Sequence, residues 1–150
     1  MSDVIDFAAL SGLEQLRAIF FDPTVPPAGM GKTMGFDHVE IDDGRVVFGA
    51  TPHVGVYNPI GTVHGGFAAT LLDSCVGCAV HSKLKAGQGY TTLELKVAYH
   101  RAMTEHTGPV RAEGKVISVG RRAAFAEGRL TDLKGRLYAT ATSTLLVFDR

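Results

Sequence analysis

One carboxylate stands alone in an otherwise uncharged run of the sequence. Residues 58–80 read NPIGTVHGGFAATLLDSCVGCAV, and Asp73 is the single charged side chain among them. An unpaired carboxylate is costly to bury, so Asp73 needs a hydrogen-bonding partner, a counter-ion or a proton. It could be a structural acid bonded to Thr70, to Ser74 or to a group across an interface. It could equally be functional, because a carboxylate held in apolar surroundings makes a good base or nucleophile.

Polar and glycine residues lead into the middle of this run. The HGG sequence at 64–66 follows a polar, glycine-rich approach, which predicts that a helix begins near Gly65. The first N–H groups of a helix lack internal partners and carry partial positive charge, and glycine lets a ligand oxygen approach them. Such a terminus can hold an anion or stabilise an oxyanion. The alternatives are structural: the glycines could serve only tight packing, His64 could bond a neighbouring loop, and Asn58 could cap its own turn before Pro59.

The elements that must position these groups show two periodicities. Ser11 and Glu14 match a capping box and apolar residues follow at helical spacing, which predicts a short helix at 11–21 and then a proline-rich loop at 22–31. Residues 92–99 alternate polar and apolar side chains, as expected for a strand with one buried face. Strands are predicted at 36–41, 44–52, 91–102, 110–120, 122–132 and 136–148, with a hairpin turn at 134–135.

The order of these elements is a helix, two strands, a long apolar helix and four strands. A helix that is apolar on all sides needs a surface curved around it, and an antiparallel sheet of about six strands can supply one. We therefore expect a single α+β domain over 1–150, in which the sheet wraps the central helix and residues 1–34 form an N-terminal helix and loop. Residues 65–80 are nearly long enough to span a membrane, but Asp73 at their centre and the strand-rich remainder argue against it.

The composition argues against several classes of function. Fifteen basic and fifteen acidic residues give zero formal net charge, so the chain lacks the broad basic field of a non-specific nucleic-acid binder. The six histidines form no HxxxH or HxH pair, so the sequence predicts no metal site, and no cofactor is implied. Cys75 and Cys78 are expected to be small core side chains, with a redox pair as the alternative. Because the N-terminus has acids in place of a basic signal sequence, we expect a cytoplasmic protein that binds no membrane.

The run that holds Asp73 also resembles a known family signature. NPIGTVHGGFAATLLD is similar to the N-x-x-G-x-x-HGG-x-x-x-x-L-x-D signature of hotdog-fold acyl-CoA thioesterases, in particular their phenylacetate-degradation (PaaI-like) branch. TTLELKVAYHRA and VGRRAAFAEGRL resemble the family as well, so the likeness runs from about residue 35 to the end. It implies the hotdog fold, in which a roughly six-stranded antiparallel sheet wraps a long central helix, here with a short helix before it.

The resemblance implies roles for four residues of the signature. Asp73 stands where the family has its catalytic carboxylate, which acts as base or nucleophile. Gly65 stands where a backbone N–H polarises the thioester carbonyl. Asn58 and His64 match polar residues that orient the substrate or the water.

A pair of threonines follows the central helix. Thr91 falls where many members of the family carry a serine or threonine that helps to position the hydrolytic water. Thr92 is adjacent, so a slip of one residue would move this role or abolish it.

The spacing of Gly65 and Asp73 bears on assembly. They are eight residues apart, so on one helix they are separated by about 12 Å, far more than a thioester carbon and its oxygen span. Two antiparallel copies of the helix could place Gly65 of one beside Asp73 of the other. We therefore expect a site shared between the subunits of at least a homodimer, and the resemblance implies a homotetramer built as a dimer of dimers.

The phosphates of CoA require cations, and few Lys or Arg residues are clustered in this neutral chain. Gly120, Arg121 and Arg122 lie at an expected strand boundary, where two guanidinium groups and a flexible backbone would suit a phosphate. Arg101, at the end of its strand, is a weaker candidate. The alternative is that adjacent arginines at a turn are simply solvated.

The activity that these residues favour is hydrolysis of an acyl-CoA, with aryl and phenylacetyl thioesters among the candidates, to a carboxylic acid and free CoA. Water activated by Asp73, or water attacking an anhydride formed on Asp73, would reach a carbonyl polarised by the N–H of Gly65. The sequence leaves both routes open. Two other functions stay open: a hydratase or dehydratase acting on enoyl or hydroxyacyl thioesters, and a non-catalytic acyl-CoA-binding module.

Overall fold

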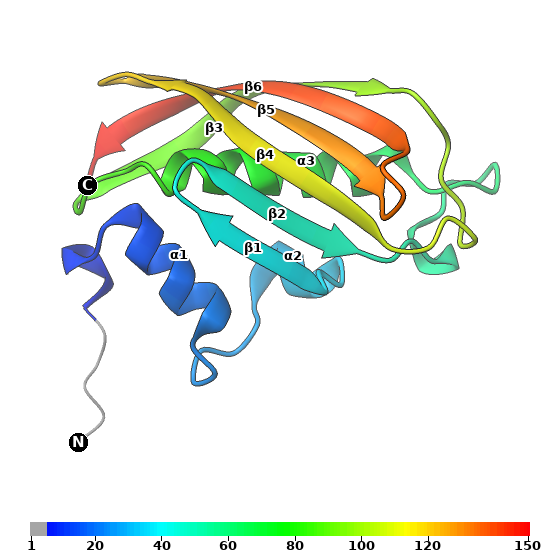
Figure 1. Cartoon of the computed structure of the whole chain (residues 1–150), viewed down its shortest axis with the longest axis horizontal. Coiled ribbons are helices and arrows are strands. Elements are labelled where there is room, and N and C mark those ends of the chain that lie inside the picture. Colours follow the sequence, from blue (N-terminus) through cyan, green and yellow to red (C-terminus); the bar gives the residue numbers. More distant parts are fainter. Residues whose placement is uncertain (1–5) are drawn as a thin grey trace.

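One antiparallel sheet and one long helix make up most of the computed structural model, which describes residues 6–150 (Figure 1). The helices are α1 (Gly12–Phe21), α2 (Gly29–Thr33) and α3 (Gly65–His81), with short 3₁₀ helices at Phe7–Ala9 and Val54–Val56. The strands are β1 (His38–Asp42), β2 (Arg45–Ala50), β3 (Gln88–Tyr99), β4 (Val110–Val119), β5 (Ala123–Asp132) and β6 (Leu137–Asp149). The predicted order of elements is therefore confirmed.

The six strands form one sheet in the order β1-β2-β4-β5-β6-β3, and every neighbouring pair is antiparallel. Figure 1 shows this sheet curving over α3, so the expected α+β hotdog fold is confirmed. β1 and β3 are the two edge strands. β3 is twelve residues long, which leaves a long row of backbone N–H and C=O groups without a neighbouring strand.

Helix α3 packs closely against the sheet. The buried apolar side chains of α3 are Phe67, Ala68, Leu71, Leu72, Cys75, Val76, Ala79 and Val80, and His81 at its end is buried as well. Gly114 on β4 makes the close approach possible, because a Cβ atom there would collide with the backbone of Cys75. α3 is thus the buried central helix that the sequence predicted. Within residues 6–150, no helix is both long enough and apolar enough to cross a membrane.

The N-terminal segment packs on the end of α3 through polar contacts. Ser11 and Glu14 form the predicted capping box at the start of α1. The amide Nε2 of Gln15 donates to two backbone carbonyls of the preceding turn, and its Oε1 lies 2.9 Å from Nε2 of His81, the last residue of α3. The loop predicted at 22–31 is only partly correct, because α2 begins inside it at Gly29.

The two cysteines are core side chains. Cys75 is buried, Cys78 is half-buried, and both are free thiols. Burial raises the pKa of both, in the case of Cys78 to about 12. The thiols therefore stay protonated near neutral pH, which agrees with a packing role and not with a reactive pair.

Candidate active site

Asp73 lies in the middle of α3, on the half-buried side of the helix. Its Oδ1 accepts a hydrogen bond of 3.0 Å from the hydroxyl of Thr92 on β3. The structure thus gives this carboxylate one fixed partner on the neighbouring strand. Among the described residues, neither Thr70 nor Ser74 bonds to Asp73, and the hydroxyl of Thr70 donates to the carbonyl of Gly66 instead.

The carboxylate of Asp73 lines a cavity of about 540 Å³. Three phenylalanines share its wall: the ring of buried Phe48 lies 5.1 Å from that of Phe20 and 5.2 Å from that of Phe36, between centroids. The other lining residues include Ile19, Pro26, Pro27, Gly31 and Lys32 from the N-terminal segment and Cys78, Tyr90 and Thr92 from α3 and β3. The cavity is therefore largely apolar, and α1, α2 and the loop between them cover it.

The N-terminus of α3 has one free backbone donor. The side chain of His64 caps the helix, because its Nδ1 accepts from the N–H of Gly66 at 2.8 Å, and its carbonyl accepts from the N–H of Phe67. In the part of the chain that the structure describes, the N–H of Gly65 has no acceptor. The hydroxyl of Tyr99 donates to the carbonyl of Gly65 at 2.8 Å and so ties this turn to the end of β3. The free N–H can polarise a substrate carbonyl.

Gly65 and Asp73 face different spaces within one chain. Gly65 lines a second cavity of about 390 Å³ together with His64, Tyr99 and Arg101, whereas Asp73 lines the first. Because α3 is continuous from one residue to the other, about 12 Å of helix separates them. Within a single chain, the free N–H of Gly65 and the carboxylate of Asp73 are thus too far apart to contact one thioester.

Asn58 follows the structural alternative within its own chain. Its Oδ1 accepts from the backbone N–H groups of Ile60 and Thr62, and its Nδ2 donates to the hydroxyl of Thr62. The side chain thereby closes the 58–62 turn, and it lines neither the Asp73 cavity nor the Gly65 cavity.

The two threonines of β3 point to opposite faces of the sheet. Thr92 faces α3 and reaches Asp73, whereas Thr91 is exposed. Thr92, and not Thr91, therefore lies beside the carboxylate of its own chain, because the strand turns the side chain of Thr91 away from it; the water-positioning role stays a prediction. Thr92 was the neighbouring alternative, and the sequence alone did not fix the register.

The Gly120–Arg122 segment forms the turn between β4 and β5, and its residues are exposed. The carbonyl of Arg122 accepts from the N–H of Val147, which pairs with Tyr90 near the start of β3. Tyr99, beside Gly65, is nine residues further along that strand, or about 30 Å. The structure therefore does not bring this turn to Gly65 of the same chain, whereas Arg101 lies at the Gly65 end.

Two parts of the site were not predicted from the sequence. The contact of Tyr99 with Gly65 joins residues thirty-four positions apart, and no local pattern indicates it. Phe20 falls within the helix predicted at 11–21, but that prediction does not show that its ring faces the cavity of Asp73. No three His, Cys, Asp or Glu side chains among residues 6–150 lie close enough together to hold a metal ion.

Comparison with known proteins agrees with these features. The profile of the thioesterase superfamily matches residues 60–139. A 1,4-dihydroxy-2-naphthoyl-CoA hydrolase from Listeria monocytogenes is 24% identical over 119 residues, which cover 79% of this chain and 95% of that protein.

Solved structures share the fold over most of the chain. A phenylacetic acid degradation-related protein from Ralstonia eutropha JMP134 has a TM-score of 0.75 and 25% identity, and the match covers 86% of this chain and 97% of that one. The protein smu.793 from Streptococcus mutans UA159, solved with acetyl CoA bound, has a TM-score of 0.69 and 25% identity, covering 77% and 90%. The region matched by the thioesterase profile, 60–139, includes α3, on which Gly65 and Asp73 lie.

Proposed function

The chain belongs to the thioesterase superfamily, and we propose that its substrate is an acyl-CoA, which it hydrolyses to a carboxylic acid and free CoA. The observation that carries this proposal is the carboxylate of Asp73, which Thr92 holds at the wall of a largely apolar cavity. Such a cavity accepts an acyl group, and its three phenylalanine rings favour apolar acyl groups, aryl groups among them.

The chemistry divides between the N-terminus of α3, where Gly65 lies, and its middle, where Asp73 lies. The N–H of Gly65 stabilises the negative charge that develops on the thioester oxygen. Asp73 either takes a proton from the attacking water or attacks the carbonyl carbon itself to form a mixed anhydride, which water then hydrolyses. In both routes the thiolate of CoA leaves and is protonated. Incorporation of oxygen-18 from water into Asp73 during a single turnover distinguishes the anhydride route from the general-base route.

The active site is proposed to lie between two subunits. Gly65 and Asp73 line separate cavities in one chain, so an antiparallel partner must bring its Gly65 to Asp73. The unpaired edge of β3 suits such a pairing, and Leu93 on this strand is 59% exposed. The family resemblance supports a further step, in which two dimers form a tetramer.

An antiparallel dimer would also determine where the turn at Gly120–Arg122 lies relative to the active site. Pairing through β3 would carry the turn of the partner toward the Gly65 end of this chain, because the two strands run in opposite directions. This arrangement makes the guanidinium groups of Arg121 and Arg122 one candidate contact for the phosphates of CoA bound mainly by the other subunit. Two free thiols and a CoA substrate fit the cytoplasmic location that we propose.

A panel of acyl-CoA substrates with a thiol-detecting reagent tests the function. We expect release of free CoA, and we expect the substitution Asp73→Asn to lower kcat by at least about 10²-fold because it removes the base and keeps the volume. Ser74→Ala is the matched control, since Ser74 lines the same cavity on the next residue of α3. Hydration of an enoyl-CoA without thiol release, or binding without any reaction, would exclude hydrolysis as the function.

A further inference from the structure

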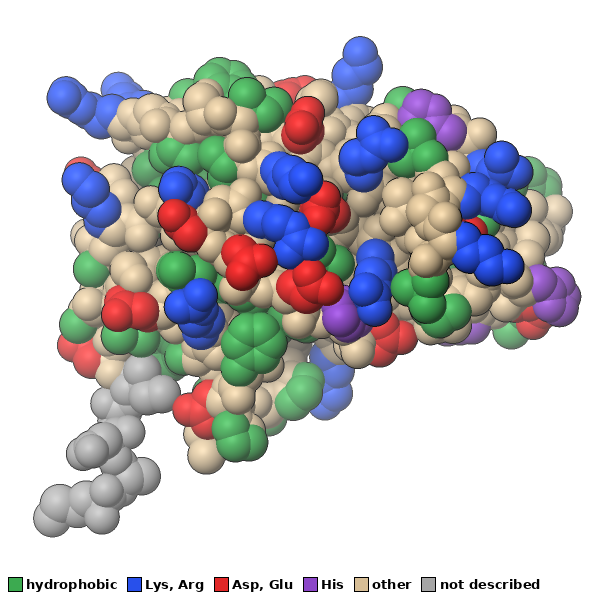
Figure 2. Space-filling view, viewed as in Figure 1, with side chains coloured by type: hydrophobic (Ala, Val, Ile, Leu, Met, Phe, Trp, Pro, Cys, Tyr) green, Lys and Arg blue, Asp and Glu red, His purple; other side chains and the backbone are tan. Residues whose placement is uncertain are grey.

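A basic groove lies at the end of the sheet nearest Gly65. The groove, of about 570 Å³, runs between the loop at 100–109 and the turn that joins β5 to β6. Its cationic lining residues are Arg101, Lys134 and Arg136, with His106 beside them. In Figure 2, Lys and Arg side chains gather at the right-hand end of the molecule, where Figure 1 places the loop between β3 and β4.

The cations of this groove lack carboxylate partners. Among the described residues, Arg101, Lys134 and Arg136 make no ion pair. The one carboxylate that lines the groove is Asp132, whose Oδ1 accepts from the backbone N–H groups of Arg136 and Lys134, at 2.9 Å each. These bonds lower the pKa of Asp132, so it stays charged, and a net positive charge still remains in the groove.

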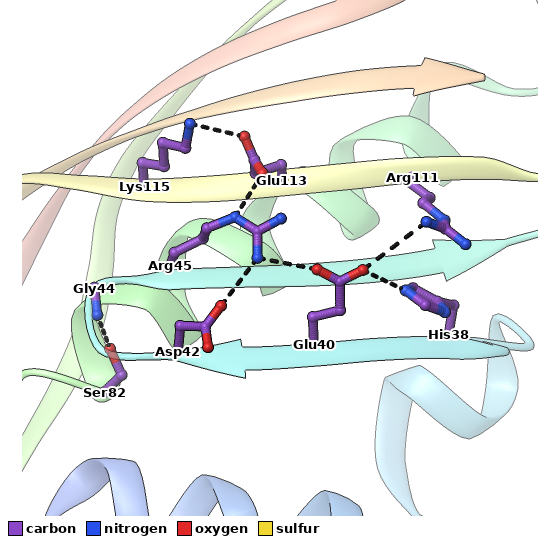
Figure 3. Close-up of polar contacts among 9 residues, drawn as sticks. All are labelled: His38, Glu40, Asp42, Gly44, Arg45, Ser82, Arg111, Glu113 and Lys115. Carbon is purple, nitrogen blue, oxygen red and sulfur yellow. Dashed lines mark hydrogen bonds and ion pairs between the residues drawn. The ribbon is translucent and has the colours of Figure 1, made fainter. Parts of the chain in front are cut away.

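The paired charges on the outer face of β1, β2 and β4 provide a contrast (Figure 3). There the guanidinium of Arg45 contacts the carboxylates of Glu40, Asp42 and Glu113 at 2.7 to 3.1 Å. Lys115 adds a contact of 3.0 Å to Glu113. Charges arranged in this way satisfy one another, whereas the cations of the groove are free to meet an anion from outside.

Hydroxyl groups add neutral donors to the same groove. The Oγ1 atom of Thr104 accepts from the N–H of His106, and the Oγ1 atom of Thr107 accepts from the N–H of Thr104. Both hydroxyl protons are therefore left to donate elsewhere, and both threonines line the groove. Guanidinium groups together with hydroxyl donors are a combination that suits phosphate oxygens.

The groove continues into the cavity of Gly65. Arg101 and Ala102 line both spaces, so a ligand whose carbonyl lies at the N–H of Gly65 can extend past them. We propose that this groove binds the phosphates of the CoA nucleotide, an inference that rests on the proposed thioesterase function. The proposal places the phosphates on the same chain as Gly65, as an alternative to the turn at Gly120–Arg122 of a partner subunit.

Two double variants with equal loss of charge separate these alternatives. Lys134→Ala with Arg136→Ala removes two cations of the groove and keeps the backbone N–H groups that bind Asp132. Arg121→Ala with Arg122→Ala removes two cations from the other hairpin turn. We expect the groove variant to raise KM for acyl-CoA about tenfold or more with kcat changed less than about twofold, because these contacts lie far from the reacting bond.

Substrates of two lengths make the result specific for phosphate. An acyl-pantetheine lacks the nucleotide, so the increase in KM of the groove variant should disappear with it. An equal increase with acyl-pantetheine, an unchanged KM for acyl-CoA, or an increase confined to the Arg121 and Arg122 variant would each overturn the assignment while leaving the thioesterase function in place.

Calorimetric binding of adenosine 3′,5′-bisphosphate tests the groove without any turnover. We expect the wild type and the Arg121 and Arg122 variant to bind it equally, and the Lys134 and Arg136 variant to bind it about tenfold or more weakly. Inorganic phosphate bound as tightly as the nucleotide would mark a general anion site and overturn the assignment to CoA. Absence of CoA release from every acyl-CoA would instead reject the proposed function, and this binding measurement would still report on the groove.

Discussion

The hydrogen bond between Thr92 and Asp73 gives a sharp test of how the carboxylate is positioned. The substitution Thr92→Val removes the hydroxyl that donates to Oδ1 at 3.0 Å and keeps the branched shape of the side chain. Asp73 would keep its place on α3 but lose the contact that fixes the direction of its oxygens. We therefore expect turnover to fall while substrate binding changes little.

The magnitude follows from the nature of the bond. A hydrogen bond to a charged group contributes about 1.5–3 kcal/mol, and the half-buried position of Asp73 favours the lower end of that range. About 1.5 kcal/mol of lost transition-state stabilisation corresponds to a decrease of roughly tenfold in kcat. Thr92→Ser retains a hydroxyl and should recover most of the activity.

Thr91→Val is the matched control, because it makes the same chemical change one residue earlier on the exposed face of β3. Steady-state kinetics with an acyl-CoA and a thiol reagent would measure kcat and KM for all three variants. We expect Thr91→Val to stay within about twofold of the wild type. Wild-type kcat in Thr92→Val, or an equal loss in Thr91→Val, would refute the positioning argument.

Two further predictions concern the ends of α3. Tyr99→Phe removes the hydrogen bond to the carbonyl of Gly65. We expect kcat to fall by several-fold to about tenfold, with little change in KM. An increase in KM alone would contradict this expectation. Burial lowers the pKa of His81 in the folded protein below its ordinary value of 6.5. As the pH falls below 6.5, the imidazole of His81 is therefore protonated in the unfolded chain before it is protonated in the folded one, and this favours unfolding. The melting temperature should therefore fall more steeply below that pH in the wild type than in His81→Gln, and parallel pH curves for the two proteins would exclude the effect.

Features that depend on local sequence were predictable. The start of α1 follows from its capping box, in which the side chains of Ser11 and Glu14 bond to nearby backbone and to each other. The start of α3 at Gly65 follows from the change from polar residues to an uninterrupted apolar run. The curved sheet follows from the need to cover a helix that is apolar on all sides. The two helix starts depend on residues that are close in the chain, and the sheet follows from the apolar character of α3.

Features that depend on register and on distant contacts were not predictable. Thr91 and Thr92 are both polar neighbours at the start of a strand, and only the pairing with β6 determines which of them faces α3. Asn58 matched the family signature, yet in its own chain the amide closes a turn. The helix at 29–33 was missed for a different, local reason, because its residues include two glycines and have low helix propensity.

The central claim is that each active site combines Gly65 of one subunit with Asp73 of another. Asp73→Asn removes the carboxylate, and Gly65→Pro removes the backbone N–H at the first helical position, where proline is tolerated. His64, the residue before it, already has the extended conformation that proline requires, with φ −61° and ψ 136°. Gly65→Ala is the control, because it adds the same Cβ atom near the hydroxyl of Tyr99 and keeps the N–H.

Unfolding the two inactive variants, mixing them and refolding them together tests the claim directly. A mixed dimer would contain one intact site and one site that lacks both groups. With random pairing, about a quarter of the wild-type activity should return in an equal mixture, whereas each variant refolded alone should stay inactive. No recovery of activity in mixed dimers whose formation is verified, for example by two different affinity tags, would contradict the shared site.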